Sequence, residues 1–182
     1  MKNKNRTTEI LFAGFGGQGI MFMGKLLAQV GLDSKKNVTW MPSYGAEVRG
    51  GTAYSMTKIS DKQIASPIVT RPDILVVMNE PSLIKYADKL KPKGILIINK
   101  SLVASKPHRR DISIVSIPMT DLALKLGSAR SANMVAVGAL LKRSKLFPIR
   151  TVLEALKEML GGKEDAYPVN KKAIEKGYSC NK

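Results

Sequence analysis

The stretch of residues 9–31 constrains the fold of this chain more than any other part of the sequence. An apolar run at 9–13 leads into a glycine-rich turn at 14–19, and residues 20–30 carry apolar side chains at helical spacing. A strand, a glycine turn and an amphipathic helix in this order are typical of the opening unit of a Rossmann-like α/β fold. The first group of candidate site residues is therefore Gly14, Gly16, Gly17, Gln18 and Gly19.

The glycine turn indicates a fold more clearly than it indicates a ligand. The free N–H groups at the start of its helix favour an anion or a carbonyl oxygen. A dinucleotide site usually has an Asp or Glu about 20 residues after the glycines, at the end of the second strand. No carboxylate closes the second predicted strand, residues 37–41, because Asp33 precedes it and Glu47 follows several residues later. This favours a structural or partner-contact role for the turn over NAD binding.

A second unusual stretch, residues 43–52, follows the second predicted strand. Its three glycines bracket Glu47 and Arg49, which predicts a shaped loop rather than a helix or strand interior. The two charged residues lie two positions apart, so they point to opposite sides of an extended segment and need partners elsewhere. The loop is either a surface loop with incidental charges or one that docks a neighbour or covers a site. Its candidate residues are Ser43, Tyr44, Gly45, Glu47, Arg49, Gly50, Gly51 and Thr52.

The rest of the sequence predicts an α/β fold with a Rossmann-like, largely parallel sheet, helices on both faces and a helical C-terminal third. Continuous apolar runs at 74–78 and 95–98 are typical of strands buried on both faces. Residues 131–141 are expected to form a helix that is apolar nearly all round, with Ser131 as its cap, and Gly177 is expected to end the last helix. A buried Asn133 in this helix must tie down a loop or meet a ligand, and we favour the loop. No linker divides residues 1–182, so we expect a single domain.

The composition of the chain argues against several classes of function. The single histidine, His108, and the single cysteine, Cys180, leave no metal cluster and no catalytic constellation in the sequence. The formal net charge is +16, but aromatic residues make up only 5% and the basic residues are dispersed, which argues against nucleic acid. No signal peptide and no apolar run of about 18 residues is present, so we expect a cytoplasmic protein that does not bind membranes.

The two glycine-bearing stretches together carry a resemblance to a known family. Gly-Phe-Gly-Gly-Gln-Gly-Ile at 14–20, followed by residues 43–52, resembles the gamma subunit of 2-oxoacid:ferredoxin oxidoreductases. Later segments at 66–67, 72–73 and 133–139 fit the same family, so the likeness covers nearly the whole chain. The Tyr-Gly-Ala-Glu-Val-Arg-Gly-Gly sequence at 44–51 is most similar to the 2-oxoglutarate and branched-chain 2-oxoacid (ketoisovalerate) enzymes, and indolepyruvate oxidoreductase stays open.

The resemblance implies a place in an oxygen-sensitive complex. Such a complex decarboxylates a 2-oxoacid on thiamine diphosphate with Mg, passes electrons through iron–sulfur clusters to ferredoxin, and transfers the acyl group to coenzyme A. The implied partners are alpha and beta subunits, a ferredoxin-like delta subunit where present, and ferredoxin. This chain would bind no cofactor alone. Its two loops both follow strand ends, so we expect them at one edge of the sheet, facing the alpha and beta subunits, with Arg49 paired to a carboxylate or phosphate.

Two alternatives belong to other functional classes. A free-standing NAD(P)-binding enzyme would use Arg49 on a 2′-phosphate, and nucleotide titration would identify it. A basic nucleic-acid-binding protein would shift nucleic acid in a gel in a salt-dependent way.

Overall fold

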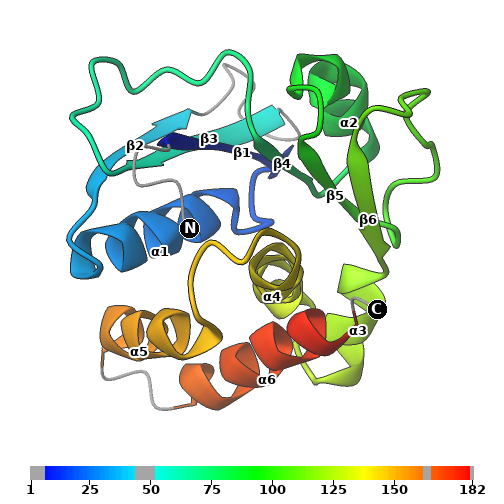
Figure 1. Ribbon diagram of the computed structural model, residues 1–182. Coiled ribbons are helices and arrows are strands. Elements are labelled where there is room, and N and C mark those ends of the chain that lie inside the picture. Colours follow the sequence, from blue (N-terminus) through cyan, green and yellow to red (C-terminus); the bar gives the residue numbers. More distant parts are fainter. Residues whose placement is uncertain (1–6, 44–51, 162–164, 181–182) are drawn as a thin grey trace.

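The computed structural model describes residues 7–43, 52–161 and 165–180 and is built on a six-stranded β-sheet (Figure 1). The strands lie side by side in the order β2-β3-β1-β4-β5-β6. Their bounds are β1 (Thr7–Phe15), β2 (Asn37–Ser43), β3 (Thr52–Ser60), β4 (Ile74–Val77), β5 (Ile95–Asn99) and β6 (Ser113–Ile117). The helices are α1 (Ile20–Asp33), α2 (Glu80–Tyr86), α3 (Met119–Lys125), α4 (Ala132–Ser144), α5 (Ile149–Leu160) and α6 (Ala166–Ser179), with short 3-10 turns η1 (Ala87–Lys89) and η2 (Ala129–Ser131).

The sheet is mixed but largely parallel. β4 pairs in parallel with both β1 and β5, and β5 pairs in parallel with β6. β3 is antiparallel to both of its neighbours, β1 and β2, so it alone runs against the other five strands. The predicted α/β class with a largely parallel sheet is confirmed, and β3 is the exception within it.

Side chains of the central strand point alternately to two separate cores, as the pleat of a strand requires. Ile10 and Phe12 belong to the core that contains residues of α1 and α4, whereas Leu11 and Ala13 belong to the core that contains residues of α2. All four side chains are at most 1% exposed. Burial on both faces explains why the strands read as continuous apolar runs rather than as alternating patterns.

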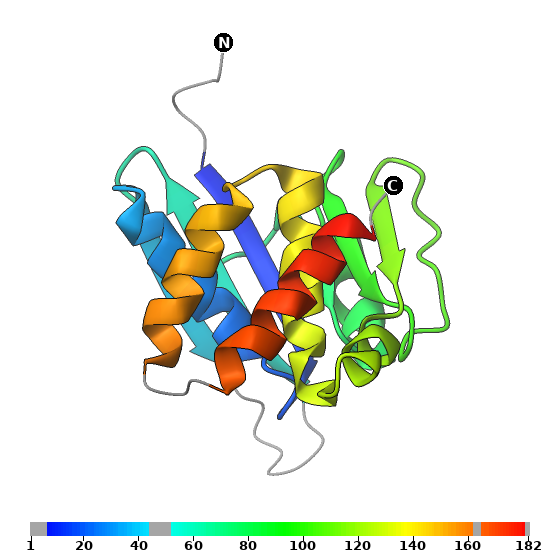
Figure 2. The ribbon, with the colours of Figure 1, turned by 90° about the horizontal axis from the view of Figure 1, so that it is seen from below.

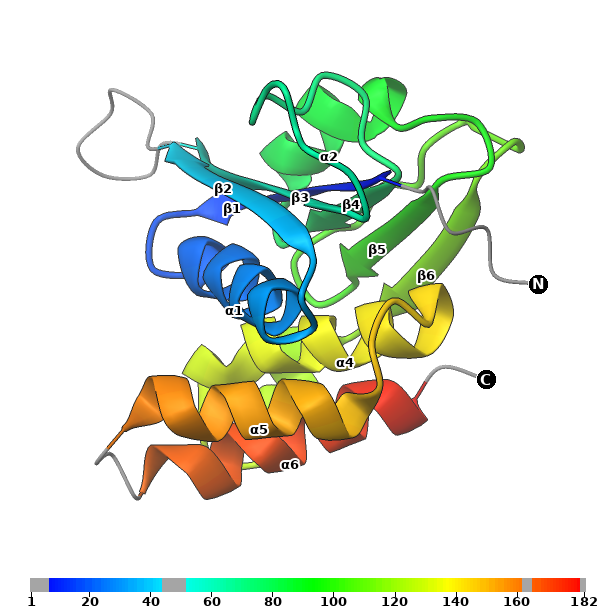
Figure 3. The ribbon, with the colours of Figure 1, turned by 60° about the vertical axis from the view of Figure 1, so that its left-hand side comes forward.

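The two faces of the sheet are covered unequally. α1 and α4 pack against one face, and α5 and α6 form a further layer beneath them (Figures 2 and 3). α2 lies on the opposite face (Figure 3). The C-terminal third is therefore helical, as predicted, and it thickens one side of the sheet into a two-layer stack of helices.

The crossing of α4 and α6 explains one sequence prediction that was wrong. Gly177 was expected to end the last helix, but α6 continues to Ser179. A Cβ atom on Gly177 would lie 2.0 Å from the carbonyl oxygen of Val135, and a Cβ on Gly138 would lie 2.0 Å from the carbonyl oxygen of Ile174. Each glycine thus lets the backbone of one helix touch the other, which no side chain would permit. Residues 132–141 of α4 are all buried, as their apolar pattern predicted.

The start of α4 also differs from the prediction in one detail. Ser131 precedes the helix, but its side chain makes no capping hydrogen bond. The reason is that η2 runs directly into α4, and the Ala132 N–H donates to the Ala129 carbonyl instead. The positive end of the helical segment therefore lies at Ala129 and Arg130 rather than at Ser131.

Candidate functional site

The glycine turn joins the carboxyl end of β1 to the first turn of α1. Gly17 and Gly19 have φ angles of 89° and 71°, in the left-handed region where a side chain is unfavourable. A Cβ on Gly19 would also lie 2.1 Å from the Nδ2 atom of Asn133. Gly19 therefore serves both the backbone conformation and the close approach of α4.

The Gln18 side chain stabilises the glycine turn through two hydrogen bonds. The Phe15 N–H donates to the Gln18 Oε1 atom at 2.7 Å, and the Gln18 Nε2 atom donates to the Met78 carbonyl at 3.2 Å. A Cβ on Gly14 would lie 2.6 Å from the same Oε1 atom, so a glycine is needed there to admit the side chain. One amide thus links the end of β1 to the end of β4.

Asn133, in the first turn of α4, contacts the start of α1. Its Nδ2 atom donates to the Gly19 carbonyl at 3.5 Å, and the residue is 7% exposed. This contact is the loop-tying role that we favoured from the sequence. The Oδ1 atom is buried without a hydrogen-bond partner in the described part of the chain, so its requirement for a donor is unmet.

The second candidate loop begins and ends at the same edge of the sheet as the glycine turn. Thr52 is paired with Phe15, and Ser43 is paired with Tyr54, two residues further along β3. The other candidates of this loop lie outside the described residues: Tyr44, Gly45, Glu47, Arg49, Gly50 and Gly51.

A lysine and two tyrosines that the sequence did not single out lie beside Thr52. The Lys85 Nζ atom donates to the Thr52 Oγ1 atom at 3.4 Å and lies 5.4 Å from the centre of the Tyr86 ring. The Tyr86 and Tyr54 rings are 6.0 Å apart, centre to centre. Burial, together with the neighbouring Tyr54, raises the pKa of Tyr86 above its ordinary value, so its hydroxyl stays protonated.

A crevice lies at the carboxyl edge where the strand order changes direction. After β1 the chain passes to β2 on one side, and β4 then pairs with β1 on the other, which makes the β1–β4 boundary a topological switch point. We call this hollow the switch-point crevice; its volume is about 230 Å³. Its walls are formed by Gly17, Gln18, Met78, Leu102, Thr120, Ala129, Arg130 and Ala132.

The switch-point crevice is too small for a dinucleotide, because pockets for drug-sized ligands measure about 300–1,000 Å³. The α1 N-terminus, where a pyrophosphate would bind, is in contact with Asn133. Met78, Leu102 and Thr120 each follow a strand end, so counting the residues after each strand would have identified them. Arg130 follows α3 and precedes α4, and no strand pattern points to it.

Two other features lie at the opposite, amino end of the sheet. A hollow of about 550 Å³ beside the start of β2 is lined by 37–39 and 63–65, which include no charged side chain. Glu9 forms ion pairs with Lys58 at 2.7 Å and Lys91 at 2.8 Å, and Lys91 also pairs with Asp73 at 3.2 Å. Burial raises the pKa of Glu9, but the hydrogen bonds and charges of the two lysines outweigh it and leave the pKa below its ordinary value.

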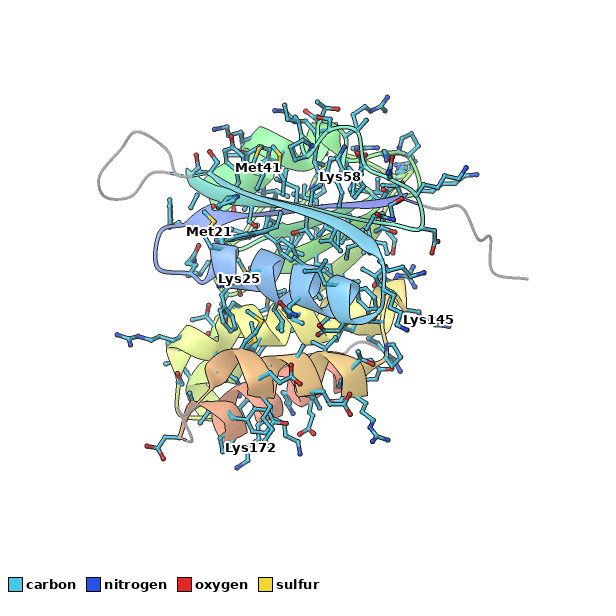
Figure 4. All side chains as sticks on the ribbon, turned by 90° about the vertical axis from the view of Figure 1, so that its left-hand side faces the viewer. Met21, Lys25, Met41, Lys58, Lys145 and Lys172 are labelled. Carbon is cyan, nitrogen blue, oxygen red and sulfur yellow. The ribbon has the colours of Figure 1, made fainter. Side chains whose placement is uncertain are left out.

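The single histidine and the single cysteine are not enclosed in a buried site. His108 and Cys180 are both exposed. Within 7–43, 52–161 and 165–180, no group of His, Cys, Asp and Glu side chains could hold a metal ion, and no helix has the length and apolarity of a membrane span. Basic side chains such as Lys25, Lys145 and Lys172 extend from separate elements (Figure 4), which agrees with the dispersed charge of the sequence.

Comparison with known proteins gives consistent matches. Residues 9–180 match the family model described as pyruvate ferredoxin/flavodoxin oxidoreductase. The 2-oxoglutarate synthase subunit KorC of Methanocaldococcus jannaschii is 34% identical over 99% of this chain and 98% of its own length. The ketoisovalerate oxidoreductase subunit VorA of Methanothermobacter thermautotrophicus is 34% identical over 92% of this chain, which spans only 35% of that relative's length.

Two solved structures share the fold. The gamma subunit of the keto/oxoacid ferredoxin oxidoreductase of Geobacter sulfurreducens superposes with a TM-score of 0.85 at 27% identity, covering 96% of this chain and 95% of its own. The 2-oxoglutarate:ferredoxin oxidoreductase of Magnetococcus marinus, solved with 2-oxoglutarate, coenzyme A and succinyl-CoA bound, gives a TM-score of 0.84 at 28% identity. This match covers 96% of our chain and 31% of that one.

Proposed function

The chain belongs to the pyruvate ferredoxin/flavodoxin oxidoreductase family, and from this premise we propose that it is the gamma subunit of a 2-oxoacid:ferredoxin oxidoreductase. The observation that carries the proposal is the match to KorC along nearly the full length of both chains. The VorA and KorC relatives favour 2-oxoglutarate or a branched-chain 2-oxoacid as the substrate. The comparisons do not support a free-standing NAD(P)-binding protein. The glycine turn agrees with them, because the Gln18 side chain and the close approach of Asn133 already occupy it.

The cofactors of the proposed complex are assigned to its other subunits. Thiamine diphosphate with Mg would supply the decarboxylation chemistry, iron–sulfur clusters would carry electrons to ferredoxin, and coenzyme A would accept the acyl group. Among the described residues no cluster of metal ligands is present, and the switch-point crevice is too small for a whole coenzyme. We therefore propose a single-domain, cytoplasmic chain that depends on alpha and beta subunits for activity.

The carboxyl edge of the sheet is the proposed contact with those subunits. The glycine turn, Ser43 and Thr52 lie together there, and the Gln18 and Asn133 amides hold the turn in a fixed shape. A preorganised edge binds a partner with a smaller entropy cost than a loop that orders on contact. In this proposal Arg49 pairs with a carboxylate or phosphate near the thiamine and coenzyme A site.

Anaerobic purification through a tag on this chain, expressed in its native host, tests the proposal. We expect alpha and beta subunits to copurify and the preparation to reduce a dye when 2-oxoglutarate or a branched-chain 2-oxoacid is added with coenzyme A. The purified chain alone should be inactive. Recovery of the chain without such subunits, or 2-oxoacid oxidation by the chain alone, would refute the proposal.

A further inference from the structure

The outward side of α2 carries an exposed apolar residue beside basic side chains. Ile84 is 73% exposed, the largest value among the exposed large apolar side chains of the described chain. Lys85 follows it directly, and Lys89 lies four residues further along, at the end of η1. α2 covers the face of the sheet opposite the C-terminal helices, so those helices leave its outward side open (Figure 3). A single exposed isoleucine is common on protein surfaces, so its surroundings decide whether it marks a docking surface.

Lys85 and Lys89 form a like-charge pair around one aromatic ring. Their Nζ atoms lie 5.4 Å and 5.2 Å from the centre of the Tyr86 ring, whose hydroxyl stays protonated, so the ring attracts both cations without neutralising them. Lys85 also donates to the neutral Thr52 hydroxyl. Within the described ranges neither lysine lies within salt-bridge distance of a carboxylate. Like charges four residues apart on a helical segment repel each other, and an anion between them would offset that repulsion.

A basic segment, residues 104–110, is fixed beside the lysine pair. At one end the Glu80 carboxylate accepts a backbone N–H of the segment at 2.8 Å. At the other end the Arg109 Nη1 atom donates to the Leu90 carbonyl, directly after η1, at 2.6 Å. These two contacts hold the segment against both ends of the helical stretch formed by α2 and η1. Its exposed cations without a carboxylate partner in the described chain are Lys106 and Arg110.

The acidic side chains of this region are already engaged by the chain itself. Glu80 accepts the backbone hydrogen bond of the basic segment, and Asp111 is paired with the Arg109 guanidinium at 2.6 Å. The hydrogen bond and charge of Asp111, with a smaller contribution from the charge of Asp88, outweigh burial and raise the pKa of Arg109. All three carboxylates therefore face groups other than the lysine pair. We call Ile84, Lys85 and Lys89 the α2 surface, with Lys106 and Arg110 at its rim.

We propose that the α2 surface docks an acidic polypeptide whose carboxylates flank an apolar side chain. The carboxylates would meet Lys85 and Lys89, and the apolar side chain would cover Ile84. A polypeptide fits better than a nucleic acid, because the Tyr86 ring is 4% exposed and cannot stack on a base. Charge complementarity of this kind steers association and weakens as salt is added. The inference concerns the outward side of α2 and does not depend on the proposed complex.

A titration followed by amide NMR on the full 182-residue chain at low salt tests the proposal. The probe is a blocked pentapeptide with a central leucine between two pairs of glutamates. One control peptide has glutamine at all four acidic positions, and the other has serine in place of leucine. We expect the probe to shift the amides of Ile84, Lys85 and Lys89 first. It should bind about tenfold more tightly than the glutamine peptide and about threefold more tightly than the serine peptide.

The same titration with a thymidine pentanucleotide separates the two classes of anionic partner. It carries four phosphates, so its charge matches that of the probe peptide. We expect it to bind the α2 surface at least about tenfold more weakly, because no exposed ring there can stack on its bases. Equal or tighter binding of the oligonucleotide at these residues would overturn the proposal in favour of a nucleic-acid contact.

Two substitutions with matched controls test the residues themselves. Ile84→Ser and Lys89→Gln should each weaken binding of the probe peptide about threefold. Leu124→Ser alters another exposed apolar side chain, 57% exposed on α3, and Lys25→Gln removes the same charge from an exposed position on α1. Both controls should leave binding unchanged.

Three results would each overturn the proposal. They are equal affinity for the glutamate and glutamine peptides, shifts spread evenly over the basic surface of the chain, and equal losses for Lys89→Gln and Lys25→Gln. The comparison of the peptides on the unaltered chain decides the question even where a variant folds poorly.

Discussion

At the scale of single residues, the side-chain amide of Gln18 determines the shape of the glycine turn. It satisfies the Phe15 N–H and reaches the Met78 carbonyl, so it joins two strand ends that are distant in sequence. Gln18→Ala should lower the free energy of unfolding by about 1–3 kcal/mol, because it leaves a partly buried donor without an acceptor. Denaturant unfolding measures this change.

The control for Gln18 is Gln29→Ala on α1. The Gln29 side chain bonds to Asp33 at the surface of the same helix, so its loss should change stability by less than about 0.5 kcal/mol. Equal effects of the two substitutions would show that the Gln18 amide does not hold the turn.

The functional prediction at the scale of single residues concerns Arg49. Arg49→Ala should lower turnover or assembly of the proposed complex at least tenfold, which corresponds to about 1.4 kcal/mol. Arg71→Ala is a suitable control, because Arg71 is exposed just before β4 at the amino edge. Copurification and dye reduction measure the two effects, and an Arg49→Ala complex with unchanged yield and rate would remove the assignment.

Glu9 should make stability depend on pH in acid. Its pKa is lowered in the folded chain, so it adds stability above the pKa of the unfolded chain, near 4.5, and this stability is lost as the pH falls through the lower folded value. Glu9→Gln should cost about 1–3 kcal/mol at neutral pH and much less at a pH of about 2. Unfolding curves of both proteins at the two pH values test this. Glu154→Gln, which alters an exposed pair on α5, should show little difference at either pH.

At the scale of elements, the contact between α4 and α6 depends on Gly138 and Gly177. Alanine is normally favoured over glycine inside a helix by about 1 kcal/mol. At Gly138 the new Cβ would lie 2.0 Å from the Ile174 carbonyl oxygen, so the helices would have to separate. Gly138→Ala should therefore destabilise the chain by about 3 kcal/mol or more, as overpacking of a buried contact does.

Gly16→Ala is the matched control for this prediction. No atom lies within 4 Å of a Cβ placed on Gly16, and its φ angle is not positive. The same substitution should therefore leave stability nearly unchanged, as thermal or denaturant unfolding would show. A stable Gly138→Ala protein would mean that α4 and α6 can move apart at little cost.

The elements themselves could largely be predicted from the sequence, and their contacts could not. The apolar runs at 74–78 and 95–98 identify buried strands because burial on both faces leaves no room for polar alternation. Gly177 was misassigned because a glycine that permits helix contact looks the same in sequence as one that ends a helix. The contact of Asn133 with Gly19 joins distant parts of the chain, and only the packing of α1 against α4 brings them together. Arg130 was also not identified from the sequence, because it joins the wall of the switch-point crevice only when distant parts of the chain pack together.

At the scale of the whole molecule, the unexplained property is the formal net charge of +16. The charge is spread over many elements, so it acts as a long-range field rather than as one binding patch (Figure 4). Such a field suits acidic partner subunits or a polyanionic ligand such as coenzyme A, and salt screens it over about 10 Å at 0.1 M.

Association of this chain with its partner subunits should therefore weaken at least tenfold between about 0.05 M and about 0.5 M NaCl, mainly through a slower association rate. Surface-immobilised chain and purified partner subunits, measured over a salt series, would give both rate constants. Sodium sulfate at matched ionic strength controls for salt-specific effects, because simple screening depends on ionic strength alone. Affinity that is independent of salt would show that the contact is carried by the shape and apolar packing of the carboxyl edge. The positive charge would then have no part in assembly.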